Sequence, residues 1–153
     1  MFKKLLIAGD NHAAELSAEV LQTLAKMGVS ALSFETKDGE DYIAVGKRAI
    51  KEFETNSSLD GLVLICGTGV GMAMLANRFS FLRAVLATNS QTAYFARRHE
   101  NANCLCLAGG YTDGTTQVAQ TKNVKKILEA FLKTEFEGGR HKTRAGALSK
   151  LGE

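Results

Sequence analysis

The sequence predicts a single α/β domain in which a five-stranded parallel sheet lies between two layers of helices. Its 153 residues match the size of one domain. Hydrophobic residues at 45% and charged residues at 23% are typical of a globular chain. Five short apolar segments alternate along the chain with segments of helical periodicity. Because parallel strands need crossover connections and covering layers, this alternation favours a three-layer αβα sandwich.

Two strands and two helices are predicted in the first third of the chain. Residues 5–8 form a continuous apolar run that ends at Gly9-Asp10-Asn11, which is typical of a buried strand bounded by turn residues. Apolar residues then recur at helical spacing from residue 14 to 25. After a second strand at 29–34 and a polar turn, the pattern predicts a second amphipathic helix at 42–53.

The rest of the chain continues the alternation. Residues 62–66 predict a third strand, and the glycine-rich segment 67–71 leads into a short helix at 72–77. The later elements are expected in this order: a strand at 83–87, a helix from Asn89 or Ser90 to about residue 98, a strand at 104–108, and a helix at 116–131.

Charge is concentrated at the C-terminal end. The formal net charge is +3, and an acid-free stretch carries four positive charges, so the rest of the chain is at −1; the four are Arg140, Lys142, Arg144 and Lys150. A protein that binds nucleic acid through a broad basic face normally carries more excess charge, so we expect no nucleic-acid partner but a local anion site. We interpret residues 137–153 as a basic tail that leaves the domain body and docks on a partner subunit.

The cysteines and the hydropathy pattern favour a cytoplasmic protein. Cys66, Cys104 and Cys106 form neither an even disulfide framework nor a paired metal motif, which indicates a reducing compartment. The apolar run at residues 5–8 is too short for a signal peptide, and no segment reaches the ~20 apolar residues of a membrane helix. We therefore expect no membrane association.

Segments with unusual composition follow or precede the predicted strands. In open α/β sheets, ligands bind at the carboxyl ends of the strands. Asp10-Asn11-His12 follows the first strand and residues 66–71 end the third. A third segment, residues 98–101, lies just before the fifth strand.

The glycine-rich loop is the most informative of these segments. Gly67, Gly69 and Gly71 let backbone N–H groups converge on an anion at the start of the next helix. The loop is not a dinucleotide fingerprint, because Met72 stands where the third glycine belongs, and no Gly-Lys-Ser/Thr follows as in a P-loop. The alternative interpretation is a tight structural turn.

Cys66 changes the balance between these interpretations, because a thiol beside a helix N-terminus can act as a base or nucleophile. The simpler interpretation is a small buried residue, and this is the one we assign to Cys104 and Cys106. His99, alone, is compatible with an ordinary helix-end histidine. His12 is less informative still.

The basic tail has a comparable pair of interpretations. If residues 140–144 are helical, Arg140 and Arg144 lie on one side of the helix, an arrangement that suits a phosphate. The alternative is a solvated charge run.

Together these motifs resemble the type B ribose-5-phosphate isomerase and galactose-6-phosphate isomerase family. The strings ICGTGVGM at residues 65–72 and FEGGRH at residues 136–141 occur in the family's order and spacing. Shorter motifs between them add to the match: Ala76-Asn77-Arg78, Leu82-Arg83-Ala84, Arg98-His99 and Ala102-Asn103. The resemblance covers residues 7–144.

The resemblance implies a Rossmann-like fold and an aldose–ketose isomerase that acts on a phosphorylated sugar through an enediolate. It also implies a homodimer or homotetramer with active sites at the subunit interface, and neither a metal nor an organic cofactor. The substrate implied is ribose 5-phosphate/ribulose 5-phosphate or a hexose 6-phosphate such as galactose 6-phosphate.

Carried over by position, the resemblance implies that Cys66 moves the proton between C1 and C2, with Thr68 and the loop holding the enediolate oxygens. His99 and Asp10 would assist ring opening, and Arg140 and Arg144 would bind the phosphate. The complete substrate-binding set implied is Asn11, Gly67, Gly69, Val70, Gly71, Asn77, Glu100, Arg140 and Arg144.

The chain departs from the family pattern at three places. After the first strand, the family usually has Asp-His where this chain has Asp10-Asn11. After the histidine at 99, the family has Asn-Asp where this chain has Glu100-Asn101. Ribose-type members have an arginine where this chain has Gly110 or Tyr111. An alternative that these changes permit is a noncatalytic sugar-phosphate-binding subunit with a paralogous partner. A nucleotide-binding regulatory module would explain the glycine loop, but not Cys66 together with His99.

Overall fold

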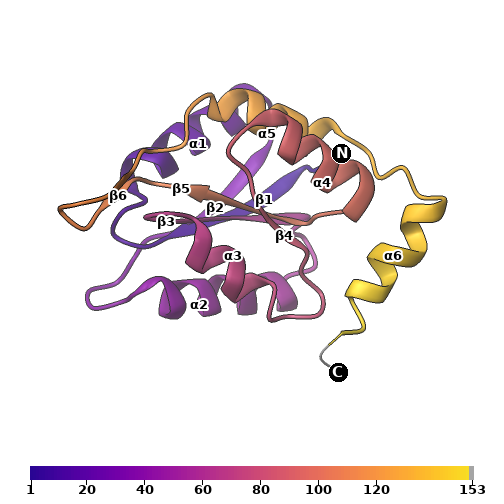
Figure 1. The fold of residues 1–153 in the computed structure, drawn as a ribbon, viewed down its shortest axis with the longest axis horizontal. Helices are drawn as coiled ribbons and strands as arrows, with labels where there is room; N and C mark the ends of the chain where they lie inside the picture. The colour runs from indigo at the N-terminus through magenta and orange to yellow at the C-terminus, as the bar shows by residue number, and fades with distance from the viewer. Residues whose placement is uncertain (152–153) are drawn as a thin grey trace.

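The computed structural model describes residues 1–151 and contains the predicted five-stranded parallel sheet (Figure 1). The strand order is β2-β1-β3-β5-β4, and every neighbouring pair is parallel. The strands are β1 (Lys4–Gly9), β2 (Ser30–Phe34), β3 (Gly61–Cys66), β4 (Ala84–Leu86) and β5 (Cys104–Ala108). The fold class expected from the alternation of apolar and helical segments is confirmed.

Helices cover both faces of this sheet, which gives the three layers of the sandwich (Figure 1). On one face lie α1 (Ala14–Lys26), α4 (Ser90–Glu100) and α5 (Val124–Lys133). On the other lie α2 (Tyr42–Thr55) and the short helix α3 (Val70–Ala76). Each face carries its own apolar core, one built around Leu16, Leu105 and Phe131 and the other around Leu64 and Met72.

Burial explains why the sequence predicts some strands from a continuous apolar run and others from a mixed one. All six residues of β3 are buried, because this strand lies at the centre of the sheet under helices on both sides. Strand β2 lies at an edge, and its burial is partial and alternates along the strand. The sequence reflects this difference: residues 62–66 of the central strand are all apolar, whereas residues 29–34 of the edge strand mix apolar and polar side chains.

The predicted helix at 116–131 is wrong in its first half. Residues Tyr111–Thr112 (β6) and Gln117–Val118 (β7) form an antiparallel hairpin, and α5 begins only at Val124. The turn is built by Asp113, which accepts hydrogen bonds from the backbone N–H groups of Thr116 and Thr115 and from the Thr115 hydroxyl. These bonds lower the pKa of Asp113 to about 2. Local turn chemistry therefore overrides the helical periodicity.

The basic tail is helical and lies against the domain. Helix α6 (Arg140–Leu148) packs beside α4 at the end of the molecule away from the β6–β7 hairpin (Figure 1). It follows Gly138 and Gly139, both with positive φ, and buries His141 and Ala145. The last two residues of the predicted tail, 152–153, lie outside the described residues. Within residues 1–151, no helix has the length and apolar character needed to cross a membrane.

Candidate active site

The glycine-rich loop connects the carboxyl end of β3 to the start of α3. Cys66 is the last residue of β3 and is 4% exposed. Gly69 precedes α3 with a φ of +76°, and a Cβ there would come within 2.5 Å of Leu86 and 3.0 Å of the Leu107 backbone. Only glycine fits this conformation and this space. The Thr68 hydroxyl accepts a hydrogen bond from the N–H of Val70 at 3.2 Å, which fixes the turn.

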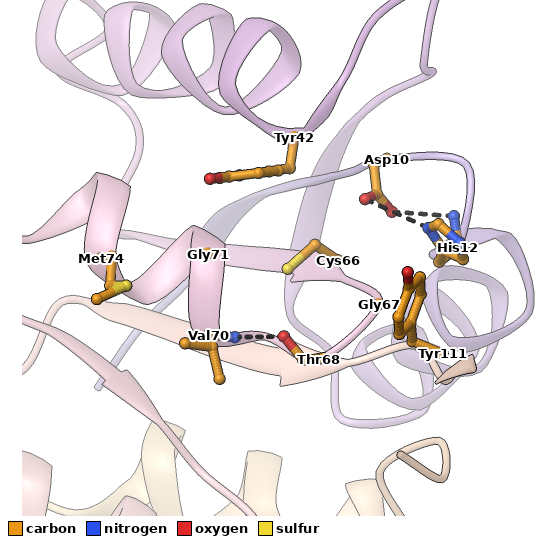
Figure 2. A pocket seen from close by; sticks show the side chains of 10 residues that line it. All are labelled: Asp10, His12, Tyr42, Cys66, Gly67, Thr68, Val70, Gly71, Met74 and Tyr111. Carbon is orange, nitrogen blue, oxygen red and sulfur yellow. Dashed lines mark hydrogen bonds and ion pairs between the residues drawn. The ribbon is translucent and has the colours of Figure 1, made fainter. Parts of the chain in front are cut away.

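A cavity of about 360 Å³ lies over this loop, within the size range of small-molecule sites. Figure 2 shows Cys66 facing the middle of the cavity, between the Asp10 and His12 side and the first turn of α3. The residues that line it come from the carboxyl ends of β1 and β3 and from three neighbouring elements: Asp10, His12, Tyr42, Cys66, Gly67, Thr68, Val70, Gly71, Met74 and Tyr111. The cavity therefore lies where ligands bind in open α/β sheets.

Asp10 and His12 form a bonded pair at one side of the cavity. The side chain of Asp10 is 9% exposed, and its Oδ1 accepts the backbone N–H of His12 at 2.9 Å. The other carboxylate oxygen lies 3.5 Å from His12 Nδ1. The carboxylate thus fixes both the turn and the direction of the imidazole ring.

Two tyrosines form part of the cavity wall. Tyr42, at the start of α2, lies so close to Gly71 that a Cβ there would be 2.8 Å from the tyrosine ring. Tyr111 packs on Gly67 and meets the ring of His12 edge to face, with centroids 5.4 Å apart. The backbone N–H of Gly110 donates to the carbonyl of Gly67 at 3.0 Å, so the β6–β7 hairpin is tied to the glycine loop.

Six of the predicted site residues line the cavity together: Asp10, Cys66, Gly67, Thr68, Val70 and Gly71. Two others lie close but do not line it. Asn11 lines a separate cavity between β2 and α1, and Gly69 lies beneath the loop against Leu86. Asn77 is engaged elsewhere, because its side-chain amide accepts from the N–H of Ala84 and donates to the Ala84 carbonyl.

Four cavity residues are absent from the predicted set: His12, Tyr42, Met74 and Tyr111. The sequence alone gives His12 little weight, although its place just after a predicted strand is a usable signal. Met74 follows Gly71 by three residues, so helical spacing puts both on one side of α3. The sequence marks Tyr111 only as a position where ribose-type family members have an arginine, and the predicted helix at 116–131 leaves no place for the hairpin that brings Tyr111 to the cavity.

Cys104 and Cys106 fulfil the structural role expected of them. Both are fully buried in β5 and lie outside the cavity. The hydrogen bond with Cys104, together with burial, raises the pKa of Cys106, so this thiol stays protonated.

Of the other predicted residues, His99 and Arg140 lie in a second cluster where α6 meets the end of α4, while Glu100 ends α4 and Arg144 lies one turn further along α6. Here the imidazole rings of His99 and His141 are stacked with their centroids 4.1 Å apart. Glu137 pairs with Arg98 at 2.6 Å and lies 3.9 Å from His141 Nε2. Arg140 donates its Nε–H to His141 at 3.4 Å.

This second cluster contains metal-ligand types, since donor atoms of His99, Glu137 and His141 lie within 4.8 Å of one another. The ring planes of the two histidines are 2° from parallel. Ring nitrogens bind a metal in the plane of the ring, and one ion cannot lie in two stacked planes. The geometry therefore fits stacking and not chelation.

Burial and charge set the protonation of this cluster. Burial lowers the pKa of His141, and the positive charges of His99, Arg140 and Arg144 lower it further. Burial alone would raise the pKa of Glu137, but the hydrogen bond and charge of Arg98 outweigh it and the pKa falls. The imidazole of His141 is thus held neutral beside a charged Arg98–Glu137 pair.

The two clusters are separate within one chain. Neither lysine nor arginine is found among the residues of the described chain that line the Cys66 cavity. Arg140 and Arg144 lie on α6, at the opposite end of the molecule from the β6–β7 hairpin (Figure 1). His99 and Glu100 line another cavity, between α4 and Val85 of β4.

Comparisons with known proteins match nearly the whole chain. The Ribose/Galactose Isomerase family matches residues 5–148. Ribose-5-phosphate isomerase B of Escherichia coli K12 is 30% identical over 154 residues, which cover 97% of this chain and 96% of that protein. A probable ribose-5-phosphate isomerase B of Mycoplasma pneumoniae is 34% identical over 147 residues, which cover 94% of this chain and 91% of its own.

Solved structures give the same match. A ribose 5-phosphate isomerase from Thermotoga maritima superposes with a TM-score of 0.84 at 33% identity and covers 97% of this chain and 99% of its own. Ribose-5-phosphate isomerase B from Mycoplasma genitalium, solved with bound ribulose 5-phosphate, gives a TM-score of 0.81 at 31% identity, with 96% and 94% covered. With the fold, the glycine loop and the family match in agreement, the chain belongs to the ribose/galactose isomerase family of sugar-phosphate isomerases.

Proposed function

We propose that this protein interconverts an aldose phosphate and its ketose through an enediolate, with Cys66 as the base. The observation that carries the proposal is the position of Cys66, whose thiol faces the cavity at the point where β3 ends and the glycine loop begins. The family match supports the reaction class.

The reaction begins when the Cys66 thiolate removes the proton from C2 of the open-chain aldose. Electrons move onto the carbonyl oxygen O1 and give an enediolate. The backbone N–H groups of residues 67–71 and the hydroxyl of Thr68 hold the developing negative charge, and a donor of this kind contributes about 3 kcal/mol. Cys66 then returns the proton to C1. A well-placed base adds roughly 10²–10⁴-fold to the rate.

A second subunit completes each site. A phosphate dianion needs cationic partners, and the cavity around Cys66 has no lysine or arginine among the described residues that line it. None of Arg140, Arg144 and His99 lines the Cys66 cavity of its own chain. We therefore assign the phosphate to the partner subunit's Arg140 and Arg144, and ring opening to Asp10 with the partner subunit's His99.

The substrate proposed is ribose 5-phosphate, with ribulose 5-phosphate as product. Relatives that match over nearly their whole length carry the name ribose-5-phosphate isomerase B, and one was solved with ribulose 5-phosphate. The cavity of about 360 Å³ is of the size that small-molecule sites have.

Turnover by the purified protein tests the proposal. Aldose–ketose interconversion is measured across four-, five- and six-carbon sugar phosphates, with Cys66→Ala beside the matched variant Cys104→Ala. Cys104 is a buried cysteine of the same sheet that lies outside the cavity. We expect turnover of ribose 5-phosphate that is lost only in Cys66→Ala. Full activity of Cys66→Ala contradicts the assignment of the base, and a folded wild-type protein without turnover favours the noncatalytic subunit.

A further inference from the structure

Glu137 lies beside the stacked rings of His99 and His141 and uses its two carboxylate oxygens separately. Oε2 accepts the Nε–H of Arg98 at 2.6 Å, and Oε1 lies 3.9 Å from His141 Nε2. A ring nitrogen of His99, one of His141 and a carboxylate oxygen of Glu137 all lie within 4.8 Å of one another. Glu137 therefore reaches both imidazole rings, although the reaction as described so far gives it no role.

Arg98 keeps this carboxylate in place. Besides the contact at 2.6 Å, the backbone N–H of Glu137 donates to the Arg98 carbonyl at 2.9 Å, so the two residues are joined through side chain and backbone. The guanidinium also donates to the hydroxyl of Tyr94 at 2.9 Å. The side chains of Arg98 and Glu137 are 44% and 38% exposed, and an ion pair as exposed as this adds little to stability. Its removal is expected to leave the fold intact.

His99 is fixed in orientation but still partly exposed. Its ring plane is set by the stack on His141, and the ring of Phe95 contacts it with centroids 5.1 Å apart. His99 also lines a cavity of about 510 Å³ between α4 and β4. Under the proposed function, this ring assists ring opening in the active site of a second subunit.

Ring opening changes the charge of an imidazole that assists it. When a cyclic aldose opens, O1 loses its proton and becomes the carbonyl oxygen, the bond between C1 and the ring oxygen breaks, and the ring oxygen gains a proton. An imidazole that takes the first proton or gives the second alternates between a neutral and a cationic ring. The cationic ring is one of the two states in either case.

Glu137 offsets the arginines around this pair of rings. Burial and the positive charges of its neighbours, Arg140 among them, lower the pKa of His141. The carboxylate of Glu137 acts in the opposite direction. An opposite charge within about 4–6 Å favours the charged form of a group, and a nitrogen of the His99 ring lies within 4.8 Å of a Glu137 oxygen. The carboxylate is thus placed to attract a positive charge on His99.

We propose that Glu137 is a positioning residue for His99, and that its carboxylate attracts the positive charge that the His99 ring carries during ring opening. Arg98 is the group that holds Glu137 in this place. The inference rests on the proposed function, because that function assigns ring opening to His99.

Deuterium exchange at C1 of ribulose 5-phosphate separates ring opening from the action of Cys66. This ketose has no ring form, because its C5 oxygen carries the phosphate, so it reaches the enediolate without a ring step. Removal of a C1 proton by Cys66 and return of a deuteron from D2O label the ketose. A ring step is needed only to exchange the aldose on the enzyme with cyclic ribose 5-phosphate.

Glu137→Gln keeps the size of the side chain and an oxygen that accepts from Arg98, but it removes the negative charge. We expect isomerisation of ribose 5-phosphate to fall about tenfold while C1 exchange of ribulose 5-phosphate falls less than about threefold. The ratio of exchange to isomerisation therefore rises. Glu135→Gln is the control, since this exposed glutamate lies two residues away, and both rates should stay unchanged. Cys66→Ala loses both rates.

A double variant tests whether Glu137 acts through His99. If it does, Glu137→Gln adds less than about twofold to the loss that His99→Gln already causes. Arg98→Gln should raise the same ratio by a smaller factor, and it carries the test if Glu137→Gln does not fold.

Three results would overturn the role assigned to Glu137: an equal fall of isomerisation and exchange in Glu137→Gln, no fall in either, or losses of Glu137→Gln and His99→Gln that multiply in the double variant. A wild-type protein that neither isomerises ribose 5-phosphate nor exchanges C1 of ribulose 5-phosphate overturns the proposed function itself.

Discussion

The imidazole rings of His99 and His141 lie face to face, with their centroids 4.1 Å apart and their planes 2° from parallel. His99 lies in the last turn of α4 and His141 in the first turn of α6, so this stack joins the C-terminal helix to the domain. Arg98, Arg140 and Glu137 surround it. A proton on His141 would add a positive charge beside His99 and Arg140, so this stack favours the neutral form of the His141 imidazole.

Docking of α6 is therefore expected to weaken in acid. The pKa of His141 is lowered from its ordinary value of 6.5 by burial and by the positive charges of His99, Arg140 and Arg144. A base with a lowered pKa in the folded state contributes full stability above 6.5 and loses it as the pH falls through the folded value. Glu137, with its pKa lowered below 4.5, adds a second loss under more acidic conditions.

Hydrogen exchange measures this loss. Protection factors of α6 amides, corrected for the pH dependence of intrinsic exchange, are expected to fall between pH 7.5 and 5 while those of α1 stay constant. In His141→Gln the fall above pH 5 should disappear. Equal loss of protection in α1 and α6, or a fall that persists in the variant, contradicts the prediction.

Gly69→Ala is expected to destabilise the protein by about 2–5 kcal/mol, because the positive φ and the clash with Leu86 and the Leu107 backbone both add to the cost. Gly28→Ala is the matched control, since Gly28 has nearly the same φ, +73° against +76°, with nothing within 4 Å of the new Cβ. The control should cost only about 1–2 kcal/mol of backbone strain. Urea unfolding of both variants gives the two values, and equal losses would show that the loop accommodates the methyl group.

Much of the fold could be predicted because its signals are local. The buried strands are continuous apolar runs in the sequence, and the glycines at 67, 69 and 71 indicate the turn between β3 and α3. The segment 111–123 could not be predicted from periodicity, because its structure depends on the Asp113 turn and on attachment to the glycine loop through Gly110 and Gly67. The Asp113 turn is local but is made by side-chain hydrogen bonds that periodicity does not report, and the Gly110–Gly67 contact joins residues distant in sequence.

The candidate site was predictable in part for the same reason. Cys66, Thr68 and the loop glycines are adjacent in sequence, so one motif places them all. Asp10 could be added because parallel strands end at one edge of the sheet. His12 and Tyr111 meet only in the folded chain, and the spacing of residues could not show that His99 and Arg140 lie far from Cys66 within one protomer.

If each active site combines two chains, inactive variants should complement each other. Cys66→Ala removes the base and His99→Gln removes the group that assists ring opening, and each alone should abolish most turnover of ribose 5-phosphate. Mixed in equal amounts after dissociation and reassociation, half of the dimers carry one of each chain and one intact site, so about a quarter of wild-type activity should return. Turnover that stays at the level of the separate variants contradicts a shared site.

Arg140→Ala and Arg144→Ala are expected to raise KM for the phosphorylated sugar by roughly tenfold or more each, since each removes a charge-assisted hydrogen bond to phosphate. The two arginines lie one turn apart on α6, as the spacing of four residues predicted. Lys142→Ala is the control, because this exposed lysine lies between them in sequence and points to another side of the helix. Steady-state kinetics at constant ionic strength should show a KM effect for the arginines and little for the lysine. Equal effects of all three would mean that α6 attracts the substrate only through its net charge.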